Sequence, residues 1–229
     1  MKLSVITINF NNKAGLEKTI RSVIDQSFKD FEYILIDGGS TDGSAEVIRE
    51  RAGEFAYWVS EKDNGIYNAM NKGILAAKGE YLLFLNSGDY LINSVILENI
   101  SPELNGDPVI YGNGKTESST GKCTNVEVPE NPGLDFFSGN SLFHPSAFIN
   151  RTLFGQYGLY NEANKIVSDW EFFIKTIMVN NVKARKIQFD ISVIEENGIS
   201  RNPESGAVLR FEIDRVLHAY FPLSVIALI

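Results

Sequence analysis

The chain has 229 residues, of which 44% are hydrophobic and 22% charged, so it can bury the core of one large domain. Its 21 Lys and Arg residues against 29 Asp and Glu residues give a net charge of -8, which excludes the basic surface typical of nucleic-acid-binding proteins. An acidic protein that binds an anion needs a local source of positive charge at the binding site, such as a divalent cation or a helix N-terminus. The single cysteine, Cys123, excludes an intramolecular disulfide and favours a reducing compartment, so we expect a cytoplasmic protein.

Residues 1–90 alternate between apolar runs and segments with helical spacing. Leu16, Ile20 and Val23 recur at the spacing of one helix face, and a later helix closes at Gly79. We expect strands at 3–8, 31–36, 57–60 and 80–85, with helices at about 16–24, 44–50 and 66–77 between them. This alternation predicts an α/β fold whose mostly parallel sheet is flanked by helices. Such sheets bind ligands at the carboxyl ends of their strands.

The composition changes after Asp89. Gly, Asn, Ser and Pro become frequent from 105 to 139 and the apolar runs shorten, which predicts a smaller antiparallel extension. The strands of this extension are expected to pair in a mixed or antiparallel way, with a helix at 169–179, strands at 183–189 and 191–194, and a final helix at about 206–220. Because no repeat or long linker divides the chain, we expect a single domain over 1–229, with one half at 1–90 and the other at 91–229.

Two turns carry carboxylates at the expected ligand edge of the sheet. Asp37 and Asp42 lie in a glycine-rich turn directly after a buried strand, where a carboxylate can accept hydrogen bonds from a base or a ribose. For Asp42, capping of the following helix is an equal alternative. Asp89 ends the turn Asn86-Ser87-Gly88-Asp89 after another strand, where one carboxylate could hold a hard cation together with ligand phosphates and water. A plain turn is the alternative there.

Five segments, in this order, resemble glycosyltransferase family 2. They are 4–11 (SVITINFN), 37–44 (DGGSTDGS), 71–73 (NKG), 77–81 (AKGEY) and 85–89 (LNSGD). Two later segments, 158–162 (GLYNE) and 168–171 (SDWE), match the acceptor half of that family more loosely. The Asn-Ser-Gly-Asp variant, together with 63–67 (DNGIY), is similar to a subgroup found among enzymes of bacterial surface-polysaccharide assembly.

This resemblance implies a GT-A fold, with nucleotide-sugar binding in the half at 1–90 and acceptor binding in the half at 91–229. It also implies roles for individual residues. It assigns metal binding to Asp89 and general-base catalysis to Asp169. The residues that it assigns to nucleotide-sugar binding are Thr7, Asn9, Asp37, Asp63, Lys72 and Ser87. Many members have Asp-Xaa-Asp-Asp where this chain has Asn86-Ser87-Gly88-Asp89, so only one carboxylate remains for Mn²⁺ or Mg²⁺. One carboxylate can suffice when phosphate oxygens and water complete the coordination.

The acceptor side has fewer candidates. His144 falls where the acceptor pocket is expected to begin, whereas His218 on the last helix is expected to be structural. Trp170 could stack on a sugar, with core packing as an equal alternative. Asp169 opens an amphipathic helix, where capping is the alternative to catalysis, and the resemblance favours the catalytic role. Glu171 projects in another direction on that helix and is the second candidate base.

The reaction that the resemblance implies is inverting hexosyl transfer from a nucleotide-diphosphate sugar. A UDP-sugar is the expected donor, with dTDP- and GDP-sugars open, and the acceptor is expected to be a saccharide or a lipid-linked saccharide. The alternative is a catalytically silent nucleotide-sugar-binding module. Nucleotidyltransferase and dehydrogenase functions are disfavoured because Asn9-Phe10-Asn11-Asn12-Lys13 is not a glycine-rich phosphate loop.

The C-terminal segment is unusually apolar. Its apolar residues are Val216, Leu217, Tyr220, Phe221, Leu223, Val225, Ile226, Leu228 and Ile229. No segment of the chain reaches the roughly 20 apolar residues that span a membrane. Arg210 and Arg215 lie nearby, a combination that suits a peripheral contact at the inner face of a membrane. Packing on the body of the protein or on a second subunit in a homodimer is the favoured alternative.

Overall fold

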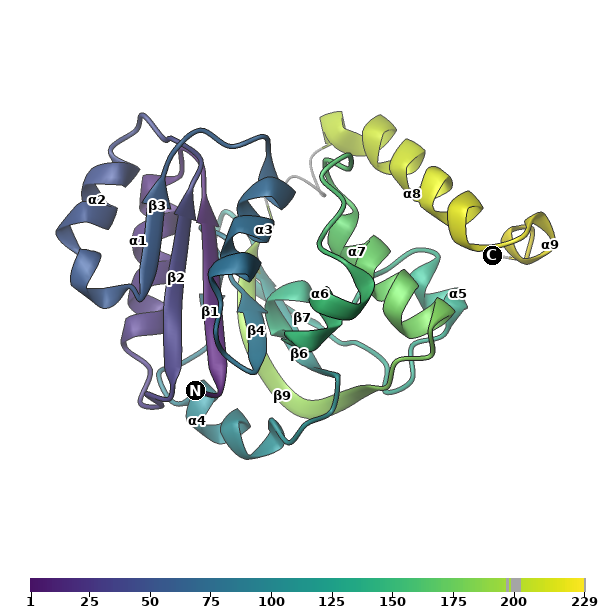
Figure 1. Cartoon of the computed structure of the whole chain (residues 1–229), viewed down its shortest axis with the longest axis horizontal. Helices are drawn as coiled ribbons and strands as arrows, with labels where there is room; N and C mark the ends of the chain where they lie inside the picture. The colour runs from purple at the N-terminus through teal and green to yellow at the C-terminus, as the bar shows by residue number, and fades with distance from the viewer. Residues whose placement is uncertain (197, 199–202, 229) are drawn as a thin grey trace.

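The computed structural model describes residues 1–196, 198 and 203–228 (Figure 1). Its first part alternates strands and helices, as the sequence predicts. The elements are β1 (Leu3–Asn9), α1 (Lys13–Ile24), β2 (Phe31–Asp37), α2 (Ser44–Glu50), β3 (Tyr57–Ser60), α3 (Ile66–Ala76) and β4 (Tyr81–Phe84). The parallel pairs β2–β3, β1–β2 and β1–β4 place the carboxyl ends of these strands at one edge of the sheet.

The second part completes a mixed sheet. Its elements are β5 (Tyr90–Leu91), α4 (Ile96–Ile100), β6 (Val109–Glu117), β7 (Cys123–Val126), α5 (Leu134–Phe137), β8 (Ala147–Asn150), α6 (Thr152–Tyr157), α7 (Ser168–Phe173), β9 (Ala184–Glu195), α8 (Gly206–Tyr220) and α9 (Leu223–Ile226). The strand order is β3-β2-β1-β4-β8-β6-β9-β5, and β7 pairs with β6. The α/β class is confirmed, with a parallel sheet in the first half and a mixed extension beyond it, in which β8 pairs antiparallel with β4 and β6 while β9 pairs parallel with β6.

Most expected elements agree with the structure to within a few residues, but two parts of the second half differ in kind. The expected strands 183–189 and 191–194 form the single strand β9, whose pairing with β6 absorbs irregularities next to Asn113. A bulge lets a strand bend without ending, so one long strand replaces two short ones. The expected helix at 169–179 is regular only in α7 and continues as a π-helix over Ile174–Val179.

The core lies on both faces of the sheet because successive strand residues point to opposite faces. Ile6 and Ile8 of β1 join the cluster that includes Met70 and Ile74 of α3. Leu3 and Val5 of β1 join a second cluster, which includes Leu16, Ile20 and Val23 of α1. The helix α3 approaches β1 closely at Gly73, where a Cβ atom would lie 2.5 Å from Cγ2 of Ile6. The two helices therefore cover opposite faces of the strands that form the ligand edge.

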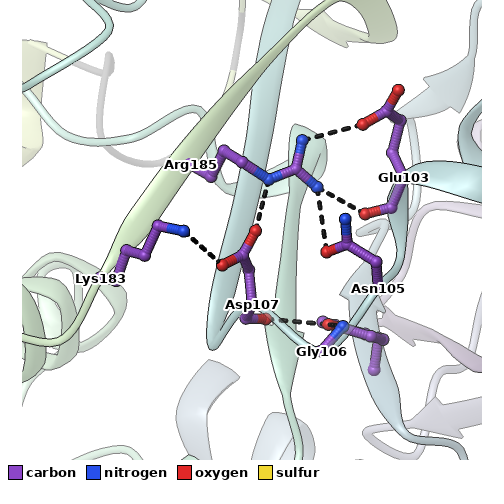
Figure 2. A network of polar contacts seen from close by, with 7 residues as sticks. Glu103, Asn105, Gly106, Asp107, Lys183 and Arg185 are labelled. Atoms are coloured by element: carbon purple, nitrogen blue, oxygen red, sulfur yellow. Dashed lines mark hydrogen bonds and ion pairs between the residues drawn. The ribbon is translucent and has the colours of Figure 1, made fainter.

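A polar network ties the chain together at the amino ends of β4, β6 and β9 (Figure 2). Nε of Arg185 lies 2.5 Å from Oδ2 of Asp107, and its Nη1 lies 2.8 Å from Oε2 of Glu103. Nζ of Lys183 lies 2.8 Å from the other oxygen of Asp107. Arginine presents several donors in one plane, so it can join separate acceptors at once. This network fixes β9 to the segment before β6, at the edge opposite the ligand edge.

Candidate active site

The carboxylate of Asp37 is the centre of the turn after β2. Its Oδ1 accepts hydrogen bonds from Nδ2 of Asn9 at 2.7 Å and from Oγ of Ser40 at 2.5 Å. Its Oδ2 accepts from Oγ of Ser60 at 2.6 Å and from the backbone N–H of Ser40 at 3.0 Å. Burial alone would raise the pKa of Asp37, but the bonds from Ser40, Ser60 and Asn9 together lower that pKa below its ordinary value. Asp37 is therefore an ionised residue that holds three strand ends together.

These bonds limit direct contact between Asp37 and a ligand. A carboxylate has about four acceptor positions, and protein donors fill all four here. Asp37 is also fully buried. Direct contact with a nucleotide would need a serine hydroxyl to turn away, so the contribution of Asp37 to a ligand site is through the shape of the turn.

Asp63, Gly38 and the exposed ring of Phe10 meet beside that turn. A Cβ atom on Gly38 would lie 2.5 Å from Oδ2 of Asp63 and 3.2 Å from the Phe10 ring, so glycine is required for this close approach. The other oxygen of Asp63 accepts the backbone N–H of Gly65 at 2.9 Å. Phe10 is 64% exposed, which is unusual for a phenylalanine directly after a buried strand. An exposed aromatic ring can stack on the face of a flat ligand ring, and a carboxylate beside it can accept hydrogen bonds from the edge of that ring.

The structure buries Thr7 in the core and pairs Lys72 with Glu61. The Thr7 side chain is fully buried, and its hydroxyl lies 3.0 Å from the hydroxyl of Tyr33 inside the core. Nζ of Lys72 lies 2.7 Å from Oε1 of Glu61, which directly follows β3. In the sheet order, β2 and β1 separate β3 from β4. The Lys72 side chain thus contacts the residue that follows β3, close to Asp63 in the chain.

The turn at 86–89 is held by α1. The backbone N–H of Ser87 donates to the carbonyl of Ile8 at 3.0 Å, and Nδ2 of Asn12 donates to the carbonyl of Ser87 at 2.9 Å. The hydroxyl of Thr19 donates to the carbonyl of Asp89 at 2.6 Å. These contacts come from both β1 and α1, so the turn is a fixed part of the sheet edge.

Asp89 lies in this turn with little to neutralise it. Burial is the main cause that raises the pKa of Asp89 and the nearby charge of Glu195 adds to it, whereas the Asn86 backbone N–H and Lys18 lower it; together they bring this pKa to about 7. Nζ of Lys18 is itself paired with Glu117 at 2.6 Å. Oδ1 of Asn86 is buried with no hydrogen-bond partner in the described part of the chain.

The chemistry of this turn fits a partial site for a hard cation. The orphaned Asn86 amide oxygen and the Asp89 carboxylate are oxygen donors of the kind that Mg²⁺ and Mn²⁺ prefer. Over residues 1–196, 198 and 203–228, no group of three or more His, Cys, Asp or Glu side chains could hold a metal by itself. A cation here would therefore depend on the phosphates of a bound ligand and on water.

Asp169 lies in the first turn of α7 in a set of aromatic and polar side chains. The Tyr67 hydroxyl donates to its Oδ1 at 2.8 Å, and Nδ1 of His144 lies 3.9 Å from its Oδ2. Nε2 of His144 lies 2.9 Å from the Tyr160 hydroxyl, and its ring stacks on Phe84 at 4.9 Å between centroids. Burial lowers the pKa of His144, which the charge of Asp169 opposes. His144 thus lies behind Asp169, in the core rather than on a pocket surface.

Trp170 and Glu171 point away from Asp169. Nε1 of Trp170 donates to the carbonyl of Phe137 at 2.9 Å, and the ring is buried in the core, so the packing alternative holds for this residue. Oε1 of Glu171 accepts from the Tyr220 hydroxyl at 3.2 Å, and its Oε2 accepts from Asn164 at 2.5 Å. Glu171 therefore joins α7 to α8, whereas Asp169 faces Tyr67 of α3.

Sequence reasoning missed Tyr67, Tyr160 and Phe10. Tyr67 and Tyr160 lie inside two of the segments that carry the family resemblance, but nothing in the sequence pairs Tyr67 with Asp169, 102 residues away. The signal for Phe10 was its place directly after a strand, among asparagines, where a buried ring is not expected.

The C-terminal helices divide into a packed part and an exposed part. Val216 and Leu217 are buried in the core, and the buried carboxylate of Glu212 accepts the backbone N–H groups of Lys165 and Ile166 at 2.6 and 3.0 Å. The packing alternative therefore holds for the inner face of α8. The side chains of Phe211, Leu223 and Leu228 remain exposed, and Ile229 lies outside the described residues. Within the described residues, no helix is both long enough and apolar enough to cross a membrane.

Two solved structures share this fold. TarS residues 1–349 of S. aureus in complex with UDP aligns with a TM-score of 0.72 at 18% identity, over 96% of this chain and 65% of that one. The mannosyltransferase PcManGT of Pyrobaculum calidifontis, in complex with GDP-Man and Mn²⁺, aligns with a TM-score of 0.65 at 17% identity, over 99% of this chain and 78% of that one. This chain spans 37% of a longer TarS chain. These likenesses establish the GT-A fold.

Sequence comparison identifies the family. An uncharacterized glycosyltransferase of Mycobacterium tuberculosis is 31% identical over 211 residues, which cover 90% of this chain and 79% of the relative. A PGL/p-HBAD biosynthesis glycosyltransferase of Mycobacterium bovis is 33% identical over 180 residues, which cover 75% of this chain and 68% of the relative. The family model described as glycosyl transferase family 2 matches residues 4–152. With the strand edge, its turns and the GT-A fold, these matches show that the chain belongs to glycosyltransferase family 2, the nucleotide-sugar-dependent glycosyltransferases.

Proposed function

We propose that this protein is an inverting hexosyltransferase that transfers a sugar from a UDP-sugar to a saccharide or lipid-linked acceptor in cell-surface polysaccharide synthesis. The observation that carries this proposal is the carboxylate of Asp169, whose Oδ1 is held by Tyr67 while its Oδ2 accepts no hydrogen bond from the described residues. A carboxylate fixed at one oxygen and open at the other is suited to removing a proton from a hydroxyl group. The UDP bound by TarS and the biosynthetic role in the name of the M. bovis relative support the substrate classes.

The donor site in this proposal follows the sheet edge from β3 to β4. The nucleobase would stack on Phe10 beside Asp63, on the turn that Asn9 and Asp37 shape. The diphosphate would lie toward Ser87 and Asp89. A divalent cation bound there would neutralise the charge of the departing diphosphate. The Mn²⁺ in the PcManGT complex is a parallel for such a cation.

The half at 91–229 would bind the acceptor and supply the base. The acceptor hydroxyl gives its proton to Oδ2 of Asp169 as its oxygen forms a bond to the anomeric carbon. The bond from that carbon to the diphosphate oxygen breaks, and its electron pair leaves with the nucleoside diphosphate. Because attack and departure occur on opposite faces, the configuration at the anomeric carbon inverts. His144, held neutral by burial, would face the carboxylate without competing for the proton.

In this proposal the enzyme lies in the cytoplasm, at the inner face of the membrane. An exposed free thiol at Cys123 suits the reducing cytoplasm. The exposed side chains of Phe211, Leu223 and Leu228, with Arg210 nearby, support a peripheral contact with the inner face of the membrane, where a lipid-linked acceptor would reside. A homodimer would cover the same apolar side chains.

The experiment that tests the function measures transfer and the release of free UDP for a panel of UDP-sugars, with Asp169→Asn as the variant. General-base catalysis contributes roughly 10²–10⁴-fold, so Asp169→Asn should lower turnover by about that factor while the donor Kd and the Tm stay unchanged. A near wild-type rate would show that the base lies elsewhere, and Glu171→Gln would be tested next. Donor binding without any release of UDP from the wild-type protein would instead identify a catalytically silent nucleotide-sugar-binding module.

A further inference from the structure

Tyr67 connects the two halves of the protein at the candidate base. It lies in the first turn of α3, and its hydroxyl is 2.8 Å from Oδ1 of Asp169 and 2.6 Å from the backbone carbonyl of Ile166. The side chain is buried, and burial with the adjacent charge of Asp169 raises the pKa of Tyr67 well above its ordinary value. The phenol therefore stays protonated, and its single proton is shared between a carboxylate and a carbonyl.

The position of Tyr67 is fixed by its own helix. One turn further along α3, Nδ2 of Asn71 donates to the carbonyl of Tyr160 at 2.9 Å, and the backbone N–H of Tyr160 donates to Oδ1 of Asn71 at 3.0 Å. This pair of bonds ties α3 to the segment after α6. Residues four apart share one face of a helix, so the same face carries Tyr67 and Asn71 toward the half at 91–229. The Tyr67 hydroxyl consequently has little freedom to move away from Asp169.

The two oxygens of Asp169 differ in their surroundings. Oδ1 is bonded to Tyr67, whereas Oδ2 faces Nδ1 of His144 at 3.9 Å, beyond hydrogen-bond distance. Nε2 of His144 is held by the Tyr160 hydroxyl at 2.9 Å. Among the described residues, the titratable groups that face Asp169 from other elements are therefore Tyr67 from α3, His144 from the segment His144–Ser146, and Tyr160. Each of the three is neutral where it stands.

We propose that Tyr67 is a positioning residue for the transfer reaction, which holds Oδ1 of Asp169 so that Oδ2 takes the proton of the acceptor hydroxyl. The inference rests on the proposed function of Asp169 as the base. A hydrogen bond donated to a carboxylate stabilises its ionised form and fixes its direction. Both effects favour a base that must be ionised and aimed before the acceptor binds.

The decisive variant is Tyr67→Phe, which removes the hydroxyl and keeps the ring. It should lower kcat by about ten- to a hundredfold, the range expected for a lost hydrogen bond to a charged group, and leave the Kd for UDP unchanged. The acidic limb of the pH–rate profile should move to higher pH, because the ionised carboxylate loses a donor. In the Asp169→Asn background, Tyr67→Phe should have no further effect on turnover, since the group through which it acts is gone.

The matched control is Tyr33→Phe. Tyr33 is also a buried tyrosine, and its hydroxyl bonds Thr7 in the core cluster on the opposite face of the sheet. Both Tyr33→Phe and Tyr67→Phe remove a buried hydroxyl and should lower the Tm, but Tyr33→Phe should change neither kcat nor the pH–rate profile. If Tyr67→Phe behaves like Tyr33→Phe in kcat and pH dependence, or lowers the rate equally in the Asp169→Asn background, the hydroxyl has only a structural role.

A second readout separates failure of this inference from failure of the proposed function. Carbon-13 NMR of the Asp169 carboxyl group, assigned with Asp169→Asn, reports its titration without turnover. The titration midpoint should rise in Tyr67→Phe and stay unchanged in Tyr33→Phe. A wild-type rate in Asp169→Asn refutes the proposed base while this midpoint still tests the contact. An inactive Asp169→Asn with an unmoved midpoint in Tyr67→Phe refutes the positioning role alone.

Discussion

Nδ2 of Asn9 lies 2.7 Å from Oδ1 of Asp37, so a buried side-chain bond joins the carboxyl ends of β1 and β2. The two residues are register partners in the parallel pair, which places both side chains on the same face of the sheet. Ser40 and Ser60 complete the contacts of this carboxylate from the following turn and from β3. The nucleoside end of the proposed site is thus built on one ionised residue.

Removal of that residue should weaken nucleotide binding. In Asp37→Ala, the turn after β2 loses all four of its bonds to the carboxylate, so the Kd for UDP should rise by the equivalent of about 1–3 kcal/mol. Isothermal titration calorimetry measures the change. Asp30→Ala removes an exposed carboxylate at the other end of β2 and should leave the Kd unaltered. Equal UDP affinity in Asp37→Ala and wild type would contradict the role of this turn.

The lowered pKa of Asp37 predicts a pH-dependent contribution to stability. A carboxyl group whose pKa is lower in the folded state stabilises the protein above its unfolded value near 3.8, and this contribution is lost as the pH falls through the folded value. The Tm of wild type should therefore exceed that of Asp37→Asn at pH 7, and the difference should shrink below about pH 4. Thermal unfolding across this pH range checks it. A difference that stays constant at every pH would show that Asp37 is not ionised in the fold.

The cation proposed at Asp89 predicts linked effects of chelator and mutation. Chelation should weaken donor binding in wild type and have no additional effect in Asp89→Ala, because that variant already lacks the carboxylate ligand. Asn86→Asp places a second carboxylate at the orphaned amide oxygen and should strengthen Mn²⁺ binding. Thermal shift with Mn²⁺ and UDP, alone and together, measures both. Full turnover in the presence of chelator would rule out the cation.

The exposed apolar side chains at the C-terminus predict binding to lipid surfaces. Deleting residues 221–229 removes Leu223 and Leu228, which are 72% and 84% exposed, and should reduce co-sedimentation with anionic liposomes. Because α8 packs through Val216 and Leu217, the truncated protein should still fold. Sedimentation velocity on both proteins tests the dimer alternative. Liposome binding that does not change on deletion would remove the membrane contact.

The network in Figure 2 predicts a stability effect without a binding effect. Arg185→Met leaves the partly buried Glu103 and Asp107 without their main partner, so the free energy of unfolding should fall by about 2–3 kcal/mol. Lys183→Met removes a cation that is 68% exposed and should cost under about 1 kcal/mol. Denaturant unfolding measures both values. The Kd for UDP should stay unchanged in each, because the network lies at the opposite edge of the sheet. A similar loss in the two variants would contradict the central role of Arg185.

The order of elements and the edge of the sheet follow from the sequence by itself. Apolar runs of strand length alternate with helical spacing through residue 85, and parallel strands must align their carboxyl ends, so Asp37 and Asp89 were expected on one edge. The motifs at these strand ends also carry the family. Local periodicity is enough for these conclusions because it reports which face of each element is buried.

Only the tertiary structure decided which side chains meet. The Thr7 side chain proved to be buried beside Tyr33, because its position in β1 directs it to the face of the sheet that α1 covers. Trp170 and Glu171 turned toward Phe137 and α8, while Asp169, on the same short helix, turned toward Tyr67. Helical spacing gives the relative directions of these three residues but not their partners. Those partners come from α3, α5 and α8, and their approach depends on packing between segments distant in the chain.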